Sequence, residues 1–265
     1  MATERLPRLA SLFDLGGRTA IVTGGHGELA AAIAETLADL GASVVLAARK
    51  LEACEELAHR LEAEYGGRAL AVATDVGREE DVQRLVGVAA AEFGSVDVLV
   101  NGAATYWAAA PEEIPTDRGW RRVLDVNLTG AFLACREAGR LMLAQGRGSI
   151  INLASTGGLM SFLPEVGATI SYTTSKGALI SLTRDLAAQW AERGVRVNAI
   201  APGSMAAGMT HTIPDAQQRL MVERIPMRRQ GRPDELRGAV AYLASDASSY
   251  TTGTVLVVDG GQTIV

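Results

Sequence analysis

Lysine is scarce in this sequence. Of its 25 lysine and arginine residues, only Lys50 and Lys176 are lysines. Cysteine is equally scarce, and we interpret its two residues, Cys54 and Cys135, as free thiols of a reducing cytoplasm. No apolar run approaches about 20 residues, and charged residues stand where a secretory signal needs an apolar stretch. We therefore expect a cytoplasmic protein without a membrane span.

An excess of positive charge is also lacking. The formal net charge is −5, whereas a protein that binds nucleic acid needs a basic face to neutralise phosphates. We therefore expect neither a nucleic acid nor a membrane as partner, and we predict no metal site. A small molecule is the expected partner.

Short β-branched runs alternate with longer segments of helical periodicity. The expected strands span residues 19–23, 43–47, 69–73, 96–100, 149–153, 195–200 and 254–258. The expected helices span residues 29–40, 51–65, 79–93, 118–144, 172–193 and 233–244. This alternation predicts an α/β fold, a Rossmann-type doubly wound parallel sheet of about seven strands with helices on both faces. Residues 1–265 are expected to form one domain, with an irregular stretch from Pro202 to about Arg232 that contains a substrate loop at about 204–232.

A glycine-rich turn joins the first expected strand to the first expected helix. Gly24, Gly25 and Gly27 let the backbone approach a pyrophosphate, and the helix that follows offers N–H groups and a positive partial charge. A tight turn without a ligand would use the same glycines. The position of the turn at the first strand-to-helix junction favours a dinucleotide site.

The end of the second strand bears on the choice between NADP and NAD. An acidic residue there binds the ribose 2′-OH, whereas an arginine accommodates a 2′-phosphate. The sequence has Arg49 and Lys50 and no acid, which favours NADP, and His26 would add a donor to the same phosphate. In the alternative, Arg49 and Lys50 only solvate the start of the next helix, and His26 is an ordinary surface residue.

Tyr172 and Lys176 stand four residues apart at the start of an expected helix, with Ser171 as its expected N-cap. A free phenol titrates near pH 10, too high for acid/base catalysis at neutral pH. Lowering its pKa by roughly three units takes about 4 kcal/mol, which a neighbouring ammonium and a bound nicotinamide cation would supply. We interpret the two residues as a proton-transfer pair; the alternative is an idle surface pair.

Two more polar residues stand at informative places. Ser155 follows the fifth expected strand, where its hydroxyl would hold a substrate carbonyl oxygen unless it only forms a turn. Asn127 falls inside a long helical segment, where asparagine is locally unfavourable. It would kink the helix or hold a water, or it is a buried amide with satisfied hydrogen bonds.

The chain resembles the short-chain dehydrogenase/reductase family over about residues 12–262. The resemblance rests on Tyr172-x-x-x-Lys176, Ser155, Asn127, Asn101 after the fourth strand, Pro202-Gly203 after the sixth and Val258-Asp259-Gly260-Gly261 near the end. Within the family, residues 162–166 and the long interval between Ser155 and Tyr172 resemble gluconate 5-dehydrogenase-like and 3-oxoacyl reductase-like members.

The resemblance implies an NAD(P)-dependent oxidoreductase that moves a hydride between the nicotinamide and the carbon bonded to the substrate oxygen. Tyr172 would be the general acid/base, Ser155 would orient the substrate oxygen, and Lys176 would hold the nicotinamide ribose and lower the pKa of Tyr172. Asn127 would support a water that links Lys176 to solvent. Members of the family are commonly homotetramers, so a homotetramer or homodimer is expected.

The cofactor site that the resemblance implies is spread over several turns. Asp75 would contact the adenine, and Asn101 would lie beside the cofactor at the end of its strand. The full set of expected cofactor contacts is Gly24, His26, Gly27, Glu28, Leu29, Arg49, Asp75, Val76, Asn101, Ala103, Tyr172, Lys176, Pro202, Gly203 and Met205.

Several positions depart from the family pattern. Glu28 and Ala30 replace turn glycines, and Ala207 stands where a threonine would bind the carboxamide. Glu28 places a carboxylate where a pyrophosphate belongs, and two like charges at about 4 Å cost about 4 kcal/mol at an effective dielectric of about 20 unless the side chain turns away. Three hypotheses stay open: an ordinary reductase, an enzyme of non-redox acid/base chemistry such as dehydration or isomerisation, and a non-catalytic binding partner.

The substrate is expected to be a carbonyl compound or secondary alcohol that sits over Ser155 and Tyr172. The expected lining comprises Trp107, Met160, Met205 and the loop at about 204–232, with His211 as a further candidate. These residues indicate an apolar or mixed pocket without an obvious arginine cluster for a carboxylate or phosphate, although methionine and tryptophan at helical spacing also occur as core residues.

Overall fold

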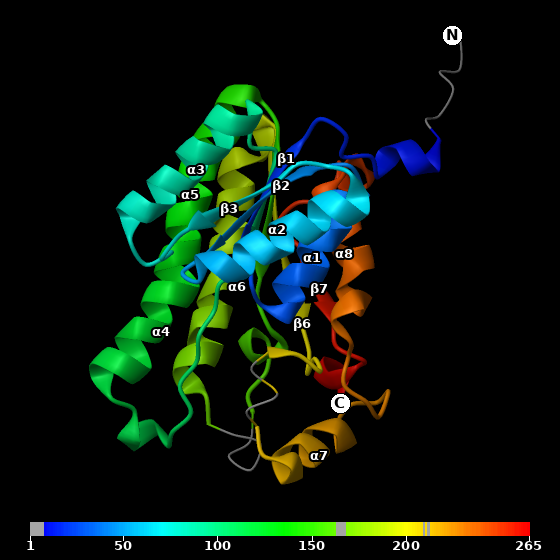
Figure 1. Ribbon diagram of the computed structural model, residues 1–265. Helices are drawn as coiled ribbons and strands as arrows, with labels where there is room; N and C mark the ends of the chain where they lie inside the picture. Colours follow the sequence, from blue (N-terminus) through cyan, green and yellow to red (C-terminus); the bar gives the residue numbers. More distant parts are fainter. Residues whose placement is uncertain (1–7, 163–167, 209, 211–212) are drawn as a thin grey trace.

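The computed structural model describes residues 8–162, 168–208, 210 and 213–265. Within this part of the chain, seven strands form one parallel sheet (Figure 1). They are β1 (Thr19–Thr23), β2 (Ser43–Ala48), β3 (Ala69–Ala73), β4 (Val98–Asn101), β5 (Gly148–Leu153), β6 (Val195–Pro202) and β7 (Val255–Val258). Their order is β3-β2-β1-β4-β5-β6-β7. It reverses between β1 and β4, the switch point at which such sheets leave a crevice for ligands.

Helices cover both faces of the sheet (Figure 1). On one face lie α1 (Glu28–Asp39), α2 (Leu51–Tyr65) and α8 (Arg237–Ala244). On the other lie α3 (Glu79–Phe93), α5 (Gly130–Gln145) and α6 (Ile170–Trp190). Short 3-10 helices span Leu9–Leu12, Pro111–Glu113, Thr156–Gly158, Ala191–Arg193, Pro233–Leu236, Asp246–Ser248 and Gln262–Ile264. None of these described helices is long and apolar enough to cross a membrane.

The central strands alternate their side chains between two apolar cores. In β1, Ala20 and Val22 pack into the core beneath α1, α2 and α8, whereas Ile21 packs into the core beneath α3, α5 and α6. A strand covered on both faces needs apolar side chains at odd and even positions alike, which is why these strands appear in the sequence as continuous apolar runs. The predicted α/β sheet with helices on both faces is confirmed.

The helix expected over residues 118–144 is not one regular α-helix. It starts as a π-helical segment, Thr116–Arg121, continues as α4 (Arg122–Leu124) and passes through a second π-helical segment, Asp125–Thr129, before α5 begins. Asn127 lies in the second π-helical segment, and its side chain is hydrogen-bonded to the backbone of Thr105. Widened turns of this kind often occur at functional sites.

The expectation that Ser171 caps its helix is wrong. The helix α6 begins at Ile170, and Thr169 occupies the N-cap position without a side-chain cap. Ser171 is fully buried in the first turn, and its hydroxyl has no hydrogen-bond partner among the described residues. The helix therefore starts without a side-chain cap, and its first turn contains a buried hydroxyl that has no partner in the described part of the chain.

The stretch from Pro202 to about Arg232 is not irregular throughout, as the sequence had indicated. It contains α7 (Asp215–Glu223), none of whose residues is fully buried. Figure 1 shows α7 beyond the end of the sheet at which β6 and β7 finish. The helix has only nine residues, most of them polar, so it offers too few apolar positions for a helical pattern to stand out in the sequence.

Candidate active site

Ser155 and Lys176 meet where β5 ends. Ser155 lies two residues beyond the strand, is buried, and accepts a hydrogen bond of 3.1 Å from the backbone N–H of Gly157. Lys176 projects from the second turn of α6, is only 3 % exposed, and donates its Nζ to the carbonyl of Leu153, the last residue of β5. Helix and strand are thereby tied together at the carboxyl edge of the sheet.

Tyr172 and Lys176 lie on one face of α6, as their spacing predicts. The Nζ of Lys176 is 5.6 Å from the centre of the Tyr172 ring. Burial raises the pKa of Tyr172 above its ordinary value, while the neighbouring hydroxyl of Ser155 acts in the opposite direction. Burial also lowers the pKa of Lys176 to about 8. The isolated protein therefore holds a neutral phenol next to an amine that titrates close to neutral pH.

Asn127 is held by three short contacts. Its Oδ1 accepts a hydrogen bond of 2.8 Å from the N–H of Thr105, and its Nδ2 donates to the Thr105 carbonyl at 2.8 Å and to Ser175 Oγ at 3.0 Å. These bonds join the second π-helical segment to α6 and to the chain beyond β4. The amide is buried and satisfied, and its water-supporting role stays a prediction.

A pocket of about 220 Å³ lies over Ser155 and Tyr172. Its lining is Tyr106, Ala108, Ser155, Thr156, Phe162, Thr169, Tyr172, Gly203, Ser204, Thr210, Ile213, Pro214, Gln217, Met221 and Gln262. Sequence reasoning missed Tyr106 and Gln262 as lining residues. Tyr106 stands next to Trp107, soon after the carboxyl end of β4, and this position could have marked it as a lining residue. The sequence around Gln262 gives no such indication.

The residues expected to line the substrate pocket lie in different parts of the structure. Trp107 is half-buried and lies close to Gly119, and Met205 is buried in the core, so neither lines this pocket. Met160 lines an adjoining pocket. His211 lies outside the described residues.

A second pocket of about 220 Å³ runs along the carboxyl ends of β1 to β4. Its lining is Gly24, His26, Ala47, Ala48, Arg49, Thr74, Asp75, Val76, Ala103, Ala104, Thr105, Arg122 and Val126. Six of the expected cofactor contacts are thus brought together: Gly24, His26, Arg49, Asp75, Val76 and Ala103. Asp75 is held there by the N–H of Gly77 at 3.0 Å and by Arg122 at 3.3 Å.

Other expected cofactor contacts lie elsewhere. Asn101 is turned into the core, where its Nδ2 donates to Asn152 Oδ1 at 2.9 Å. Leu29 packs against the core beneath α1, and Met205 is paired through its backbone with Gly231. Pro202 ends β6, and Gly203 lines the pocket over Tyr172.

The glycine turn before α1 has the geometry of a phosphate cradle. Gly24 has a φ of 76°, and a side chain there would meet the carbonyl of Gly102 at 2.8 Å. Gly27 is the N-cap of α1 and, lacking a side chain, leaves the first N–H groups of the helix without a side-chain cap. Uncapped N–H groups at the start of a twelve-residue helix favour an anion. The turn therefore fits the pyrophosphate of a dinucleotide.

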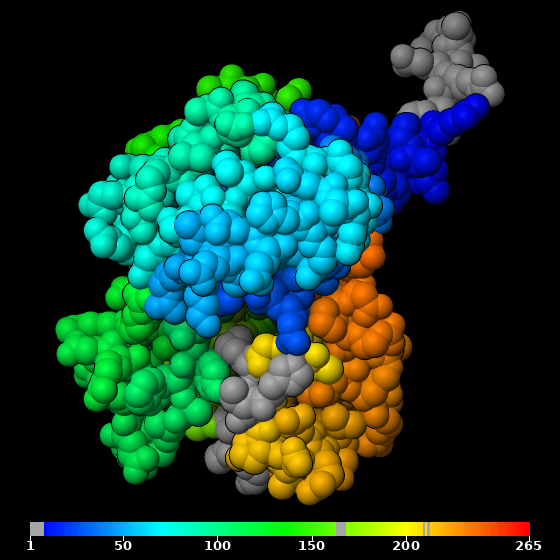
Figure 2. Space-filling model, viewed as in Figure 1, coloured from blue at the N-terminus to red at the C-terminus, as the bar shows by residue number. Residues whose placement is uncertain are grey.

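Glu28 is directed to the loop after β6. Its Oε2 accepts a hydrogen bond from the N–H of Gly208. In Figure 2 the blue N-terminal end of α1 lies against the yellow loop that follows β6, in agreement with this contact. The carboxylate is thus occupied by the loop. Thr210 of the same loop accepts a hydrogen bond from the N–H of Ala207 at 3.1 Å, so a threonine hydroxyl lies beside the position where the family pattern expects one.

Three basic side chains gather at the outer end of the pocket along β1 to β4. His26 and Arg49 line the pocket, and Lys50 follows Arg49 at the start of α2. Partial burial, followed by the positive charges of Lys50 and Arg49, lowers the pKa of His26. A positive field at this corner suits a phosphate more than a ribose hydroxyl.

Replacement of Lys176 by methionine should change how stability depends on pH. The pKa of Lys176 is about 8 in the folded state and near 10.5 in the unfolded state. Between pH 8 and pH 10.5, Lys176 is therefore protonated in the unfolded state and mostly neutral in the folded state. The free energy of unfolding of the wild type, relative to Lys176→Met, should fall by up to about 3 kcal/mol between pH 10.5 and pH 8 and then stay level. Urea unfolding of both proteins across this range measures it, and parallel pH profiles would contradict the assignment.

Comparison with known proteins agrees with this geometry. Residues 26–263 match a family model described as Enoyl-(Acyl carrier protein) reductase. The chain is 40% identical over 248 residues to cis-4-hydroxycyclohexanecarboxylate dehydrogenase of Sinomonas cyclohexanicum, covering 94% of this chain and 97% of that protein.

Solved structures show the same likeness. A short-chain type dehydrogenase/reductase from Mycobacterium marinum superposes with a TM-score of 0.92 at 36% identity, covering 97% of this chain and 100% of that one. A putative NAD(P) dependent gluconate 5-dehydrogenase from Beutenbergia cavernae, with NADP bound at low occupancy, gives a TM-score of 0.89 at 39% identity, covering 96% of this chain and 100% of that one. The protein is an NAD(P)-dependent oxidoreductase and belongs to the short-chain dehydrogenase/reductase family.

Proposed function

We propose that this protein reduces a ketone to a secondary alcohol, or runs the reverse reaction, with NADP(H) as cofactor and Tyr172 as the general acid/base. The observation that carries the proposal is the convergence of Ser155, Tyr172 and Lys176 at the carboxyl edge of the sheet, along which the pocket at the ends of β1 to β4 also lies. A bound nicotinamide would supply or accept the hydride. The residues of the chain would manage the proton.

In the direction of reduction, Ser155 orients the carbonyl oxygen and Tyr172 donates a proton to it. The raised pKa of Tyr172 keeps its hydroxyl protonated before reaction, which suits a donor. Lys176 uses one of its three donors on the Leu153 carbonyl and retains two for the nicotinamide ribose. Once Lys176 is charged, its ammonium stabilises the phenolate left after proton transfer.

The preference for NADP rests on the basic corner formed by His26, Arg49 and Lys50. Among the described residues, Asp75 is the one acidic side chain that lines the pocket at the ends of β1 to β4, and it is engaged by Gly77 and Arg122. The contact between Glu28 and Gly208 supports the redox hypothesis, because it offers the carboxylate a partner other than the turn itself. A second copy of this chain is the protein partner we propose, as a homodimer or homotetramer.

The substrate we propose is an alcohol or ketone with a compact, largely apolar carbon skeleton. Phe162, Ile213 and Met221 line the pocket over Tyr172, and its volume of about 220 Å³ suits a small ring or short chain. One relative, named as a dehydrogenase of cis-4-hydroxycyclohexanecarboxylate, acts on a molecule of this size.

Tyr172→Phe should lower kcat at least about a hundredfold, because it removes the proton donor without removing the ring. Its affinity for NADPH, measured by nicotinamide fluorescence, should stay close to that of the wild type. Tyr250→Phe, at a fully exposed tyrosine, is the matched control. Retained turnover in Tyr172→Phe would refute the assigned acid/base.

Arg49→Asp should weaken the binding of NADPH by about tenfold or more while leaving the binding of NADH equal or tighter, because it exchanges a phosphate partner for a ribose partner. Fluorescence titration with both cofactors measures the ratio. The control is Arg193→Asp, an exposed arginine that precedes β6 at the opposite end of the strands. An unchanged ratio in Arg49→Asp would contradict the proposed preference, and no binding of either cofactor by the wild type would favour non-redox chemistry or a non-catalytic role.

Glu28→Gln removes the charge and keeps an oxygen that can accept from Gly208. Because the carboxylate is occupied by the loop, this variant should change the affinity for NADPH by less than about threefold. A carboxylate pressed against the pyrophosphate would instead cost about 4 kcal/mol, and its removal would tighten binding about a thousandfold. Titration of both proteins at low and high salt distinguishes these results.

A further inference from the structure

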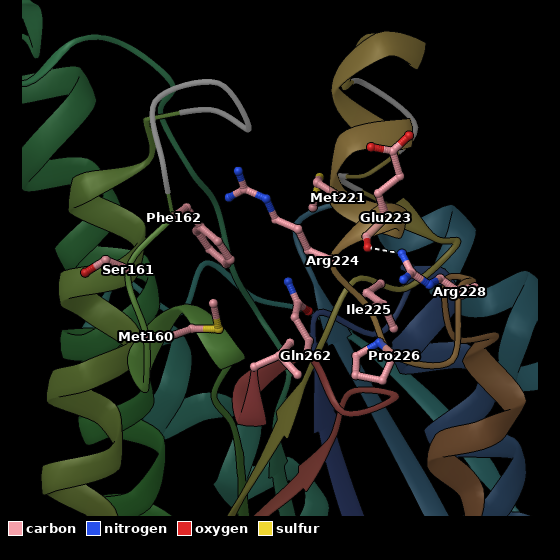
Figure 3. Close-up of a pocket in the computed structure, with 11 residues that line it drawn as sticks. Met160, Ser161, Phe162, Met221, Glu223, Arg224, Ile225, Pro226, Arg228 and Gln262 are labelled. Atoms are coloured by element: carbon pink, nitrogen blue, oxygen red, sulfur yellow. Dashed lines mark hydrogen bonds between the residues drawn. The ribbon is translucent and has the colours of Figure 1, made fainter.

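A larger pocket adjoins the one over Tyr172. Its volume is about 550 Å³, and it shares the lining residues Phe162, Met221 and Gln262 with the catalytic pocket, so the two pockets lie side by side. Figure 3 shows it between the segment after β5 on one side and the end of α7 on the other. Its lining is Met160, Ser161, Phe162, Met221, Glu223, Arg224, Ile225, Pro226, Arg228, Gln262 and Val265.

Arg224 contributes a positive charge to this pocket, although as a whole the residue is exposed to solvent. Its guanidinium is directed into the cavity, toward the side of Phe162 (Figure 3). Within the described residues it makes no hydrogen bond and no ion pair through its side chain. Arg228 differs, because its guanidinium donates to the carbonyl of Glu223. The carboxylate of Glu223 points away from the cavity in Figure 3 and leaves Arg224 unneutralised.

Gln262 adds a buried donor at the junction of the two pockets. It is only 6 % exposed, and its Oε1 accepts a hydrogen bond of 3.2 Å from the N–H of Ser204. That N–H requires an oxygen, so the amide group is fixed with its nitrogen facing the cavity (Figure 3). The nitrogen has no partner in the part of the chain that the structure describes. Because this nitrogen is open to the cavity, it can donate a hydrogen bond to a ligand that accepts one.

We propose that the adjoining pocket is a subsite for an anionic group of the substrate, a carboxylate bound by Arg224 and Gln262. This inference rests on the proposed function: the carbonyl or hydroxyl group would sit at Ser155 and Tyr172, and the carbon skeleton would pass Phe162 and Met221. A planar guanidinium pairs with a carboxylate through two parallel hydrogen bonds, and the amide nitrogen supplies a further one. The substrate class is therefore an oxo acid or hydroxy acid whose carboxylate is separated from the reacting carbon by an apolar spacer. The sequence had shown no arginine cluster that could bind a carboxylate. In this proposal Arg224 alone supplies the positive charge for it.

The test compares oxo acids with their methyl esters. Linear acids with the ketone at positions 4, 5 and 6, and cyclohexanones bearing a carboxylate at position 3 or 4, are reduced with NADPH alongside the corresponding esters. The wild type should prefer an acid over its own ester by about tenfold to a hundredfold in kcat/KM, the range of a charge-assisted hydrogen bond. The preference should decrease as salt is added.

Three variants assign the preference to its residues. Arg224→Met should abolish it through KM with little change in turnover of the esters, and Arg224→Lys should restore part of it. Gln262→Glu keeps an oxygen for Ser204 and replaces the amide nitrogen by an acceptor, so it should reverse the preference toward esters. Arg219→Met is the matched control, because Arg219 is an exposed arginine of α7, the helix that Arg224 directly follows, and it lines another hollow, with Asp215 and Gln218.

The outcomes separate this inference from the proposed function. If acids and esters are reduced equally well, or if Arg224→Met and Arg219→Met behave alike, the anion subsite is refuted while the reductase function stands. If nothing is reduced and NADPH does not bind, the proposed function fails. Thermal stabilisation by cyclohexanecarboxylate then still decides the subsite: a rise in Tm in the wild type that is lost in Arg224→Met supports it, and the absence of such a rise overturns it.

Discussion

The hydrogen bond from Lys176 to the carbonyl of Leu153 is the interaction on which the candidate site depends. It buries an amine at the point where β5 ends and α6 begins its second turn, and it thereby fixes Tyr172 next to Ser155. A group with a depressed pKa is costly to bury in its charged form. Burial of Lys176 is unfavourable for its charged form, but it places the amine where it can interact with both the Tyr172 phenol and a bound ribose. Lys176 is one of only two lysines in this arginine-rich chain, and its compact ammonium can lose a proton, which a guanidinium cannot do in a protein.

Much of the fold follows from the sequence because the sheet is covered on both faces. Residues such as Ala20, Ile21 and Val22 are all buried, so the central strands appear as continuous apolar runs that alternate with amphipathic helices. The failures have physical causes. The surface helix α7 is short and mostly polar, so its pattern did not stand out. The π-helical segment around Asn127 has its amide bonded to the backbone of Thr105, a partner 22 residues away that the sequence could not name. The expected cap of α6 is missing because Ser171 lies inside the first turn, with its hydroxyl buried.

Some residues of the candidate site could likewise be located from the sequence, and others could not. Tyr172, Lys176 and Ser155 could be located because each occupies a fixed place relative to a strand end or a helix start. The pocket walls could not, since they come from segments far apart in the chain: Gln262 lies after β7, Tyr106 after β4 and Arg224 after α7. Glu28 shows the same limit, because its partner Gly208 is brought to it only by the fold. Glutamate at position 28 looks unfavourable in a phosphate-binding turn. In the fold, however, its carboxylate accepts a hydrogen bond from Gly208, in the loop after β6.

Transfer of deuterium from cofactor to substrate tests the central claim most directly. NADPH carrying deuterium at C4 of the nicotinamide is incubated with the enzyme and a ketone, and the alcohol is analysed by mass spectrometry. The account predicts one deuterium on the carbinol carbon, transferred from one face of the nicotinamide only. Product without label, or a chain that converts its substrate equally well in the absence of any nicotinamide cofactor, would contradict it.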